Sequence, residues 1–196
     1  MTIHSQDITI APYDGVWPKI HSSAFIAPGC RIIGHVEIGP DVSIWYNCVI
    51  RGDANRIRIG ARSNIQDGTV VHCDSPKPRR PDGFPCLIGE DVLIGHMAMV
   101  HGCTLEDRSF VGLGAIVMDG CTLETEAMLA AGALLSPGKV IPSRQMWMGR
   151  PAAFARTLND EQVADMHAGV QRYVGYGRRH KESVAEGRVG YGAPER

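Results

Sequence analysis

The chain has 196 residues, enough for one domain with a small appendage. Its 20 basic and 21 acidic side chains nearly balance, so no strong electrostatic field recruits nucleic acid or an anionic membrane. No apolar run approaches the roughly 20 residues that span a bilayer, and the N-terminus lacks the apolar core of a signal peptide. These features predict a cytoplasmic protein that binds neither nucleic acid nor membrane.

Glycine (23 residues) and proline (12 residues) are too frequent for a helical bundle and are typical of short strands separated by turns. The six cysteines include no CxxC pair, which argues against a zinc ribbon and a disulfide framework. We expect Cys30, Cys48 and Cys121 to be small buried residues. The sequence leaves open whether Cys73 and Cys86 pair.

A six-residue period of large aliphatic residues begins at Ile20 and ends at Leu135. Its members are Ile20, Ile26, Ile32, Ile38, Ile44, Ile50, Ile59, Ile65, Val71, Ile88, Ile94, Val100, Leu105, Val111, Val117, Leu123, Leu129 and Leu135. Small or β-branched residues follow most of them by four positions, among them Ala24, Val36, Ala98, Thr104 and Ala115. Neither a helix nor a flat strand has this period. It predicts triangular coils of three strand-and-turn units, stacked around an aliphatic interior.

Two interruptions and a change of pattern divide the chain. The period breaks after Arg51-Gly52-Asp53 and again in the loop 74–86. We therefore predict a mainly β domain over residues 1–150, with a loop insertion at 74–86. Residues 151–186 are predicted to form a C-terminal α-helix packed on that domain, because Asn159 and Gln162 have the spacing of a capping box and an apolar stripe follows. Residues 187–196 read as a loose tail.

Three histidines lie in the middle of the repeat, whereas the other five lie near the ends or in turns. Three protein ligands and one water are typical of a catalytic zinc, and neutral imidazole is the commonest metal ligand. His96 and His101 are almost one side of the prism apart, so one chain has difficulty gathering both of them with His72. A symmetric ring in which a neighbouring chain supplies the missing ligand solves this, which predicts a homotrimer.

Polar residues near the interruptions are further candidates. Arg51 and Asp53 suit an ion pair that braces the coil or a subunit interface. Gln66 and Asp67 could be plain turn residues. Beside a metal, however, the amide could hold a water molecule and the carboxylate could orient a neighbour.

The segments RGD (residues 51–53), NIQDGTVVH (64–72) and IGHMAMVHG (94–102) together resemble the γ-class carbonic anhydrases and their bacterial relatives from phenylacetate and carnitine operons. The resemblance covers residues 17–173 and implies a left-handed parallel β-helix that assembles as a homotrimer. It implies that His72 and His101 of one subunit, with His96 of the next, bind Zn²⁺. Iron (Fe²⁺) or cobalt (Co²⁺) suits the same ligands.

The resemblance also implies a reaction and further roles. The metal lowers the pKa of a bound water molecule, the resulting hydroxide attacks CO2 to give bicarbonate, and the released proton must be exported. Gln66 positions the water, Asn64 lines the opposite wall, and Tyr173 approaches the site from the final helix. Asp67 orients Gln66 or Arg51. The implied site residues are therefore Asn64, Gln66 and Tyr173 at the catalytic centre, His72, His96 and His101 as ligands, and Arg51, Asp53 and Asp67 as structural or interface residues.

The chain departs from the archaeal prototype of that class where protons are exported. Ala54 stands where the prototype has a glutamate, Gly175 replaces an asparagine, and the loop 74–86 contains no glutamate. These differences predict weak CO2 hydration, with Asp82 or Tyr173 as alternative proton carriers.

Three other functions compete with CO2 hydration. A hexapeptide acyltransferase needs one histidine as general base and a coenzyme A groove, so the three histidines count against it. A metal-assisted acyl-CoA thioesterase would use the same site, and a trimeric scaffold would keep the metal without catalysis.

Overall fold

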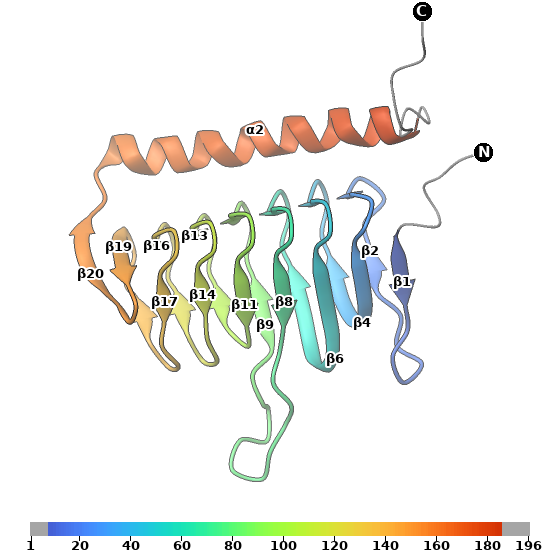
Figure 1. Cartoon of the computed structure of the whole chain (residues 1–196), viewed down its shortest axis with the longest axis horizontal. Helices are drawn as coiled ribbons and strands as arrows, with labels where there is room; N and C mark the ends of the chain where they lie inside the picture. Colours follow the sequence, from blue (N-terminus) through green and yellow to red (C-terminus); the bar gives the residue numbers. More distant parts are fainter. Residues whose placement is uncertain (1–7, 186–196) are drawn as a thin grey trace, which may run out of the picture.

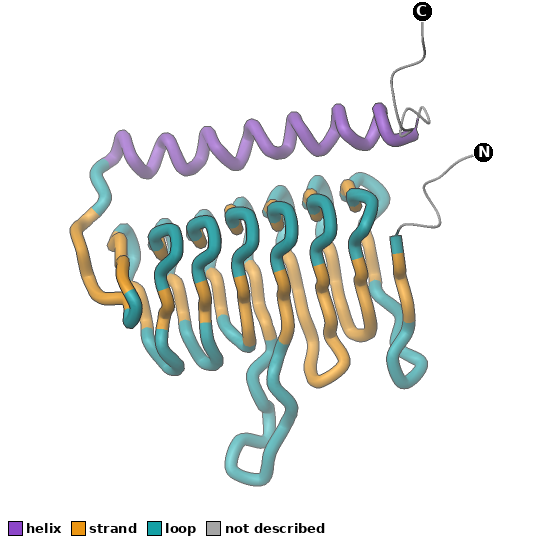
Figure 2. Tube along the Cα trace, in the orientation of Figure 1, coloured by secondary structure: helices purple, strands orange, loops and turns teal. Residues whose placement is uncertain are grey.

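The structure is a computed structural model that describes residues 8–185. Short strands and turns coil into a triangular prism, and one long helix runs along its length (Figure 1; Figure 2). No helix among the described residues is both long enough and apolar enough to cross a bilayer. The predicted mainly β chain, a parallel β-helix with a C-terminal α-helix, is confirmed.

Each coil contributes one strand to each of three faces, and neighbouring coils pair in parallel. The first face contains β1 (Thr9–Ala11), the first part of β4 (Arg31–Ile38) and of β6 (Val49–Ile59), β8 (Val70–His72), β11 (Met99–His101), β14 (Ile116–Val117) and β17 (Leu134–Leu135). The second contains β2 (Lys19–Ile20), the later parts of β4 and β6, β9 (Cys86–Ile88), β12 (Thr104–Leu105), β15 (Thr122–Leu123) and β18 (Val140–Ile141). The third contains β3 (Phe25–Ile26), β5 (Ser43–Ile44), β7 (Asn64–Ile65), β10 (Leu93–Ile94), β13 (Phe110–Val111), β16 (Met128–Leu129), β19 (Gln145–Gly149) and β20 (Ala152–Thr157).

The interior is the aliphatic column that the period predicts. The large residues from Ile32 to Leu135 are almost completely buried, and each contributes about 1.5–3 kcal/mol by leaving water. Ile20 and Ile26 are only partly buried because they lie in the first coils, at the end of the stack. One small position was wrong: Cys103 is buried and Thr104 is half-buried, because the step from Val100 to Leu105 is one residue short.

The first interruption of the period forms a bulge. Strand β4 pairs with β6 as far as Gly34 opposite Gly52, and pairing resumes with Val36 opposite Ile57. Between these pairs β4 has only His35, whereas β6 has residues 53–56. The extra residues cannot pair with β4, so they leave the coil and form a prominent corner beside the first face.

The second interruption is a loop that projects from the prism between β8 and β9 (Figure 1). Asp74 and Phe84 exchange backbone hydrogen bonds of 2.9 and 3.0 Å that close its neck. Cys73 and Cys86 flank this neck as buried, free thiols, so they form no disulfide in this structure. Burial raises the pKa of Cys73 to about 11, which keeps the thiol protonated at neutral pH.

Helix α2 (Asp160–Ala185) lies against β3, β5, β7 and β10 of the third face. The capping box that starts it is confirmed, since the Gln162 amide donates to Asn159 Oδ1 at 2.9 Å and the Asn159 amide donates to Gln162 Oε1 at 3.2 Å. The predicted start at residue 151 was wrong. Residues 152–157 instead form β20, which pairs antiparallel with β19 and closes the edge of the third face. The predicted tail, 187–196, lies outside the described residues.

Candidate metal centre

Two of the three candidate ligands meet at the corner where the first face ends. His72 is the last residue of β8, and His101 is the last residue of β11, one coil further on. The two strands pair in register with His101 opposite His72. Their rings are therefore neighbours, tilted by 53° to each other, with centroids 5.1 Å apart and His72 Nδ1 at 3.0 Å from His101 Nε2.

A carboxylate holds the far side of each ring. His72 Nε2 lies 2.9 Å from Asp53 Oδ1, and His101 Nδ1 lies 2.5 Å from Asp119 Oδ1. An ionised carboxylate only accepts hydrogen bonds, so both outer nitrogens carry the protons. Arg51 forms an ion pair with the other oxygen of Asp53.

The charge of Asp53 is secured by its partners. Burial raises the pKa of this carboxyl, but the hydrogen bonds from His72 and Arg51 outweigh burial, so its pKa is lowered. Asp53 is therefore ionised at neutral pH and fixes the tautomer of His72. Arg51, Asp53, His72, His101 and Asp119 form a continuous chain that we call the paired-histidine half-site.

This arrangement suits a divalent metal ion. With both outer nitrogens protonated, the inner nitrogens of His72 and His101 face each other, so either a proton on one of them or a metal cation must lie between their lone pairs. Two nitrogens bound to one tetrahedral ion at about 2.0–2.1 Å lie about 3.3 Å apart. The observed 3.0 Å separation needs only a small outward movement to fit.

His96 lies elsewhere, after β10 on the third face. Its Nδ1 donates to Asp67 Oδ2 at 2.7 Å, and Asp67 Oδ1 accepts from the Tyr46 amide at 3.2 Å. The lone pair of His96 is thus on Nε2, on the opposite side of a ring that is 39% exposed. Within residues 8–185, no three potential ligand side chains gather into a metal-binding group.

Asn64 and Gln66 are buried beside Asp67. Gln66 Nε2 donates to Asn64 Oδ1 at 3.1 Å, and among the described residues Asn64 Nδ2 is a buried donor with no partner. A buried donor without a partner costs about 1–3 kcal/mol, so this amide favours a bound acceptor.

Tyr173 projects from α2 onto the same region. Its ring meets Trp45 edge-on with centroids 5.4 Å apart, and it lies 5.7 Å from Tyr176. Burial and then the negative charge of Asp67 raise its pKa, so its hydroxyl is a hydrogen-bond donor at neutral pH. We call this second group, which comprises Asn64, Gln66, Asp67, His96 and Tyr173, the His96 half-site.

The structure adds one residue that the sequence interpretation missed and changes the role of another. Asp119 follows His101 by 18 positions, which is one coil of three six-residue units, so the period itself could have indicated it. Asp67 was predicted to orient Gln66 or Arg51. Its side-chain partner in this chain is instead His96, because the turn of the next coil places that ring directly beside the carboxylate.

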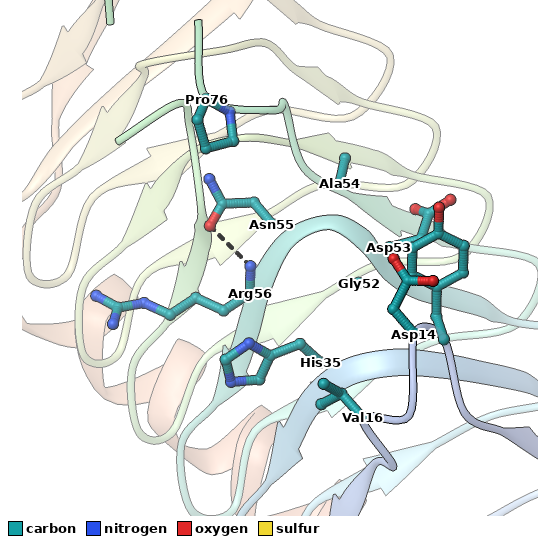
Figure 3. A pocket seen from close by; sticks show the side chains of 10 residues that line it. Asp14, Val16, His35, Gly52, Asp53, Ala54, Asn55, Arg56 and Pro76 are labelled. Carbon is teal, nitrogen blue, oxygen red and sulfur yellow. Dashed lines mark hydrogen bonds between the residues drawn. The ribbon is translucent and has the colours of Figure 1, made fainter. Parts of the chain in front are cut away.

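A cavity of about 330 Å³ lies beside the paired-histidine half-site. Figure 3 shows Asp14 and Asp53 on one side of it and His35 and Arg56 on the other. Ala54, which stands where the archaeal prototype has a glutamate, is also in its wall. Solvent therefore reaches Asp53, the partner of His72, through this cavity.

Comparisons with known proteins agree with the fold. Residues 18–52 match the family described as bacterial transferase hexapeptide (six repeats). A crystal structure from Bacillus cereus, described as a putative acetyltransferase, superposes with a TM-score of 0.85 at 38% identity and covers 90% of this chain and 98% of that one.

Sequence relatives are more specific. A probable carbonic anhydrase of Methanocaldococcus jannaschii is 48% identical over 79% of this chain and 93% of its own length. Escherichia coli YrdA is 45% identical over 84% of this chain and 90% of its own. γ carbonic anhydrase 2 of Arabidopsis thaliana mitochondria is 43% identical over 83% of this chain and 58% of its own. The chain thus spans about three fifths of this plant relative.

The stacked six-residue coils and the corner histidines define a hexapeptide-repeat protein with a potential metal site. Within that class, the chain belongs to the γ-class carbonic anhydrase family.

Proposed function

We propose that this protein catalyses the reversible hydration of CO2 to bicarbonate at metal sites between subunits of a homotrimer. His72 and His101 of one subunit and the partner subunit's His96 would hold the ion. One observation carries the proposal: two imidazole nitrogens face each other at 3.0 Å while a carboxylate fixes the proton on the far side of each ring. Relatives named as carbonic anhydrases support it.

The chemistry that a divalent ion supplies when bound is acidification of a water molecule, whose pKa falls to about 7. The side chains around the ion would bind and orient the reactants. Asn64 and Gln66 offer amides to a water molecule and to CO2, and the protonated Tyr173 hydroxyl can donate a hydrogen bond to a bicarbonate oxygen. The ion pair of Arg51 with Asp53 holds His72 and would support the subunit contact.

We propose zinc as the native ion, because a site of three histidines with one open position is typical of catalytic zinc. Fe²⁺ and Co²⁺ fit the same nitrogen ligands. The cytoplasmic location stays a prediction, since the plant relative is named as mitochondrial.

The carboxylate-held histidine pair also bears on the alternatives. An acyltransferase needs a single histidine as general base, whereas here two carboxylate-held rings face each other, which favours an ion shared between them. A thioesterase or a metal-bearing scaffold would retain the same ligand geometry, so these two functions are separated by experiment.

The test combines metal analysis of protein purified without chelator with stopped-flow CO2 hydration. We expect about one ion per subunit and measurable hydration, both abolished in His72→Ala. The matched control is His21→Ala, which removes an exposed histidine distant in the fold from both half-sites. Bound metal without hydration would contradict the proposed reaction and favour the thioesterase or the scaffold. Absence of metal from the wild-type protein would contradict the site itself.

A further inference from the structure

The neck of the loop between β8 and β9 lies beside the paired-histidine half-site. The neck is closed by the hydrogen bonds between Asp74 and Phe84. Asn55, in the neighbouring bulge, donates from Nδ2 to the carbonyl oxygens of Asp74 at 3.1 Å and of Asp82 at 2.8 Å. The loop is therefore tied at both sides of its neck to the corner that carries Asp53.

Phe84 packs against the two turns that carry His101 and Asp119. A Cβ atom placed on Gly102, which follows His101, would lie 2.8 Å from Phe84 Cβ. A Cβ atom on Gly120, which follows Asp119, would lie 2.7 Å from Phe84 Cε1. Both distances are shorter than carbon atoms tolerate, so the side chain occupies the space that the two glycines leave.

Two further contacts stabilise this arrangement, one at the ring of Phe84 and one between the two turns. The guanidinium carbon of Arg80 lies 3.8 Å from the ring centroid of Phe84, a cation–π contact. The Gly120 amide donates to the Gly102 carbonyl at 2.8 Å, so the two turns are stacked directly on each other. Phe84 thus bridges two adjacent coils at the point where the His101–Asp119 hydrogen bond joins them.

We propose that Phe84 is a positioning residue that fixes His101 and Asp119 relative to each other and so sets how firmly the site holds its metal ion. This inference rests on the proposed function. Loss of the carboxylate partner of a metal-binding histidine lowers metal affinity by about 10–100-fold. A residue that holds such a carboxylate in place therefore affects how long the metal is retained.

Two pairs of variants separate this role from general stability. Phe84→Ala removes the ring, whereas Phe84→Leu keeps an apolar contact at the two turns. Gly120→Ala drives a methyl group into the ring. Its matched control is Gly132→Ala, because Gly120 and Gly132 both have φ +68° and a Cβ on Gly132 meets no atom within 4 Å. Backbone strain is then equal, and only the contact with Phe84 differs.

The first readout is the rate at which zinc passes from the protein to an excess of chelator. We expect Phe84→Ala and Gly120→Ala to release zinc on the order of 10-fold faster than wild type. Phe84→Leu should restore most of the retention, and Gly132→Ala should release zinc at the wild-type rate. Equal release from Phe84→Ala and wild type overturns the proposal.

The second readout needs no metal. In metal-stripped protein, carbethoxylation of His101 by diethyl pyrocarbonate, mapped by mass spectrometry, should be faster in Phe84→Ala, while exposed His21 reacts unchanged. Unchanged modification of His101 also overturns the positioning role. If wild-type protein binds no zinc, the proposed function fails on that result alone, and the modification of His101 still decides the role of Phe84.

Discussion

Each candidate ligand histidine donates one ring N–H to an aspartate. The pairs are His72 with Asp53, His96 with Asp67 and His101 with Asp119. A carboxylate in this position fixes the tautomer and the ring orientation and makes the other nitrogen a better ligand. This chain's own carboxylates thus set the three ring tautomers that the proposed metal site needs.

The histidines could be found from the sequence because their short motifs are specific. Their partners were harder to find. Asp119 lies 18 residues, or one coil, after His101. The contact between them depends on the geometry of the turns in three successive repeats. Phe84 lies in a loop outside the period, so no spacing rule places it against Gly102 and Gly120.

For the proposed reaction, proton export is the step that the residues at the site support least. Hydration of CO2 gives bicarbonate and one proton, and the proton needs an acceptor. Of the two predicted carriers, Tyr173 has a raised pKa and is a poor base at neutral pH, while Asp82 stays a prediction. The other carboxyl of the loop, Asp74, has a pKa lowered chiefly by Lys77 and is a poor base as well. Ala54, in the cavity wall beside Asp53, has no ionisable group.

We therefore expect small buffers such as imidazole to raise the hydration rate in proportion to their concentration. Ala54→Glu should raise turnover at low buffer on the order of 100-fold, the lower end of the range for a general base, and should leave metal content unchanged. Stopped-flow assays across a buffer series measure both effects, with Ala54→Gln as the uncharged control. If neither the buffer concentration nor Ala54→Glu changes the hydration rate, proton export is not limiting.

At the scale of elements, the six-residue period was sufficient to predict the prism, because every unit buries side chains at the same positions. It could not specify the start of the helix. Residues 152–157 are compatible with a helix or a strand. They form β20 because the open edge of β19 offers hydrogen bonds to a further strand. Asn159 and Gln162, whose capping is local, were correctly placed from sequence alone.

Replacement of Asn159 by Ala should therefore destabilise the attachment of α2. The variant loses the acceptor for the Gln162 amide, and N-cap truncations of this kind cost about 1 kcal/mol. Denaturant unfolding of metal-free protein measures the loss, and Asn159→Asp, which keeps an acceptor, should stay near wild type. Equal destabilisation by both variants would show that the cap does not act through this hydrogen bond.

At the scale of the whole molecule, the prism separates the two half-sites. The first face ends at the paired-histidine half-site, whereas His96 follows a strand of the third face. A triangular cross-section makes these different corners of one coil, and a rigid stack of coils cannot bring them together. The proposed three-histidine site would therefore need a second copy of the chain, and in a ring of three copies every half-site would be used.

Mixed subunits test this arrangement. His72→Ala and His96→Ala should each bind no metal alone, because each destroys one half of every site. Dissociated, mixed equally and reassembled at random, they should regain about one quarter of the wild-type sites, since each half-site is intact in half of the chains. Metal analysis after reassembly measures this recovery. The control mixes wild type with the double variant His72→Ala/His96→Ala: about one quarter of sites should survive if sites are shared, but about one half if each chain builds its own. No recovery in the first mixture together with one half in the control would show that each site lies within a single chain.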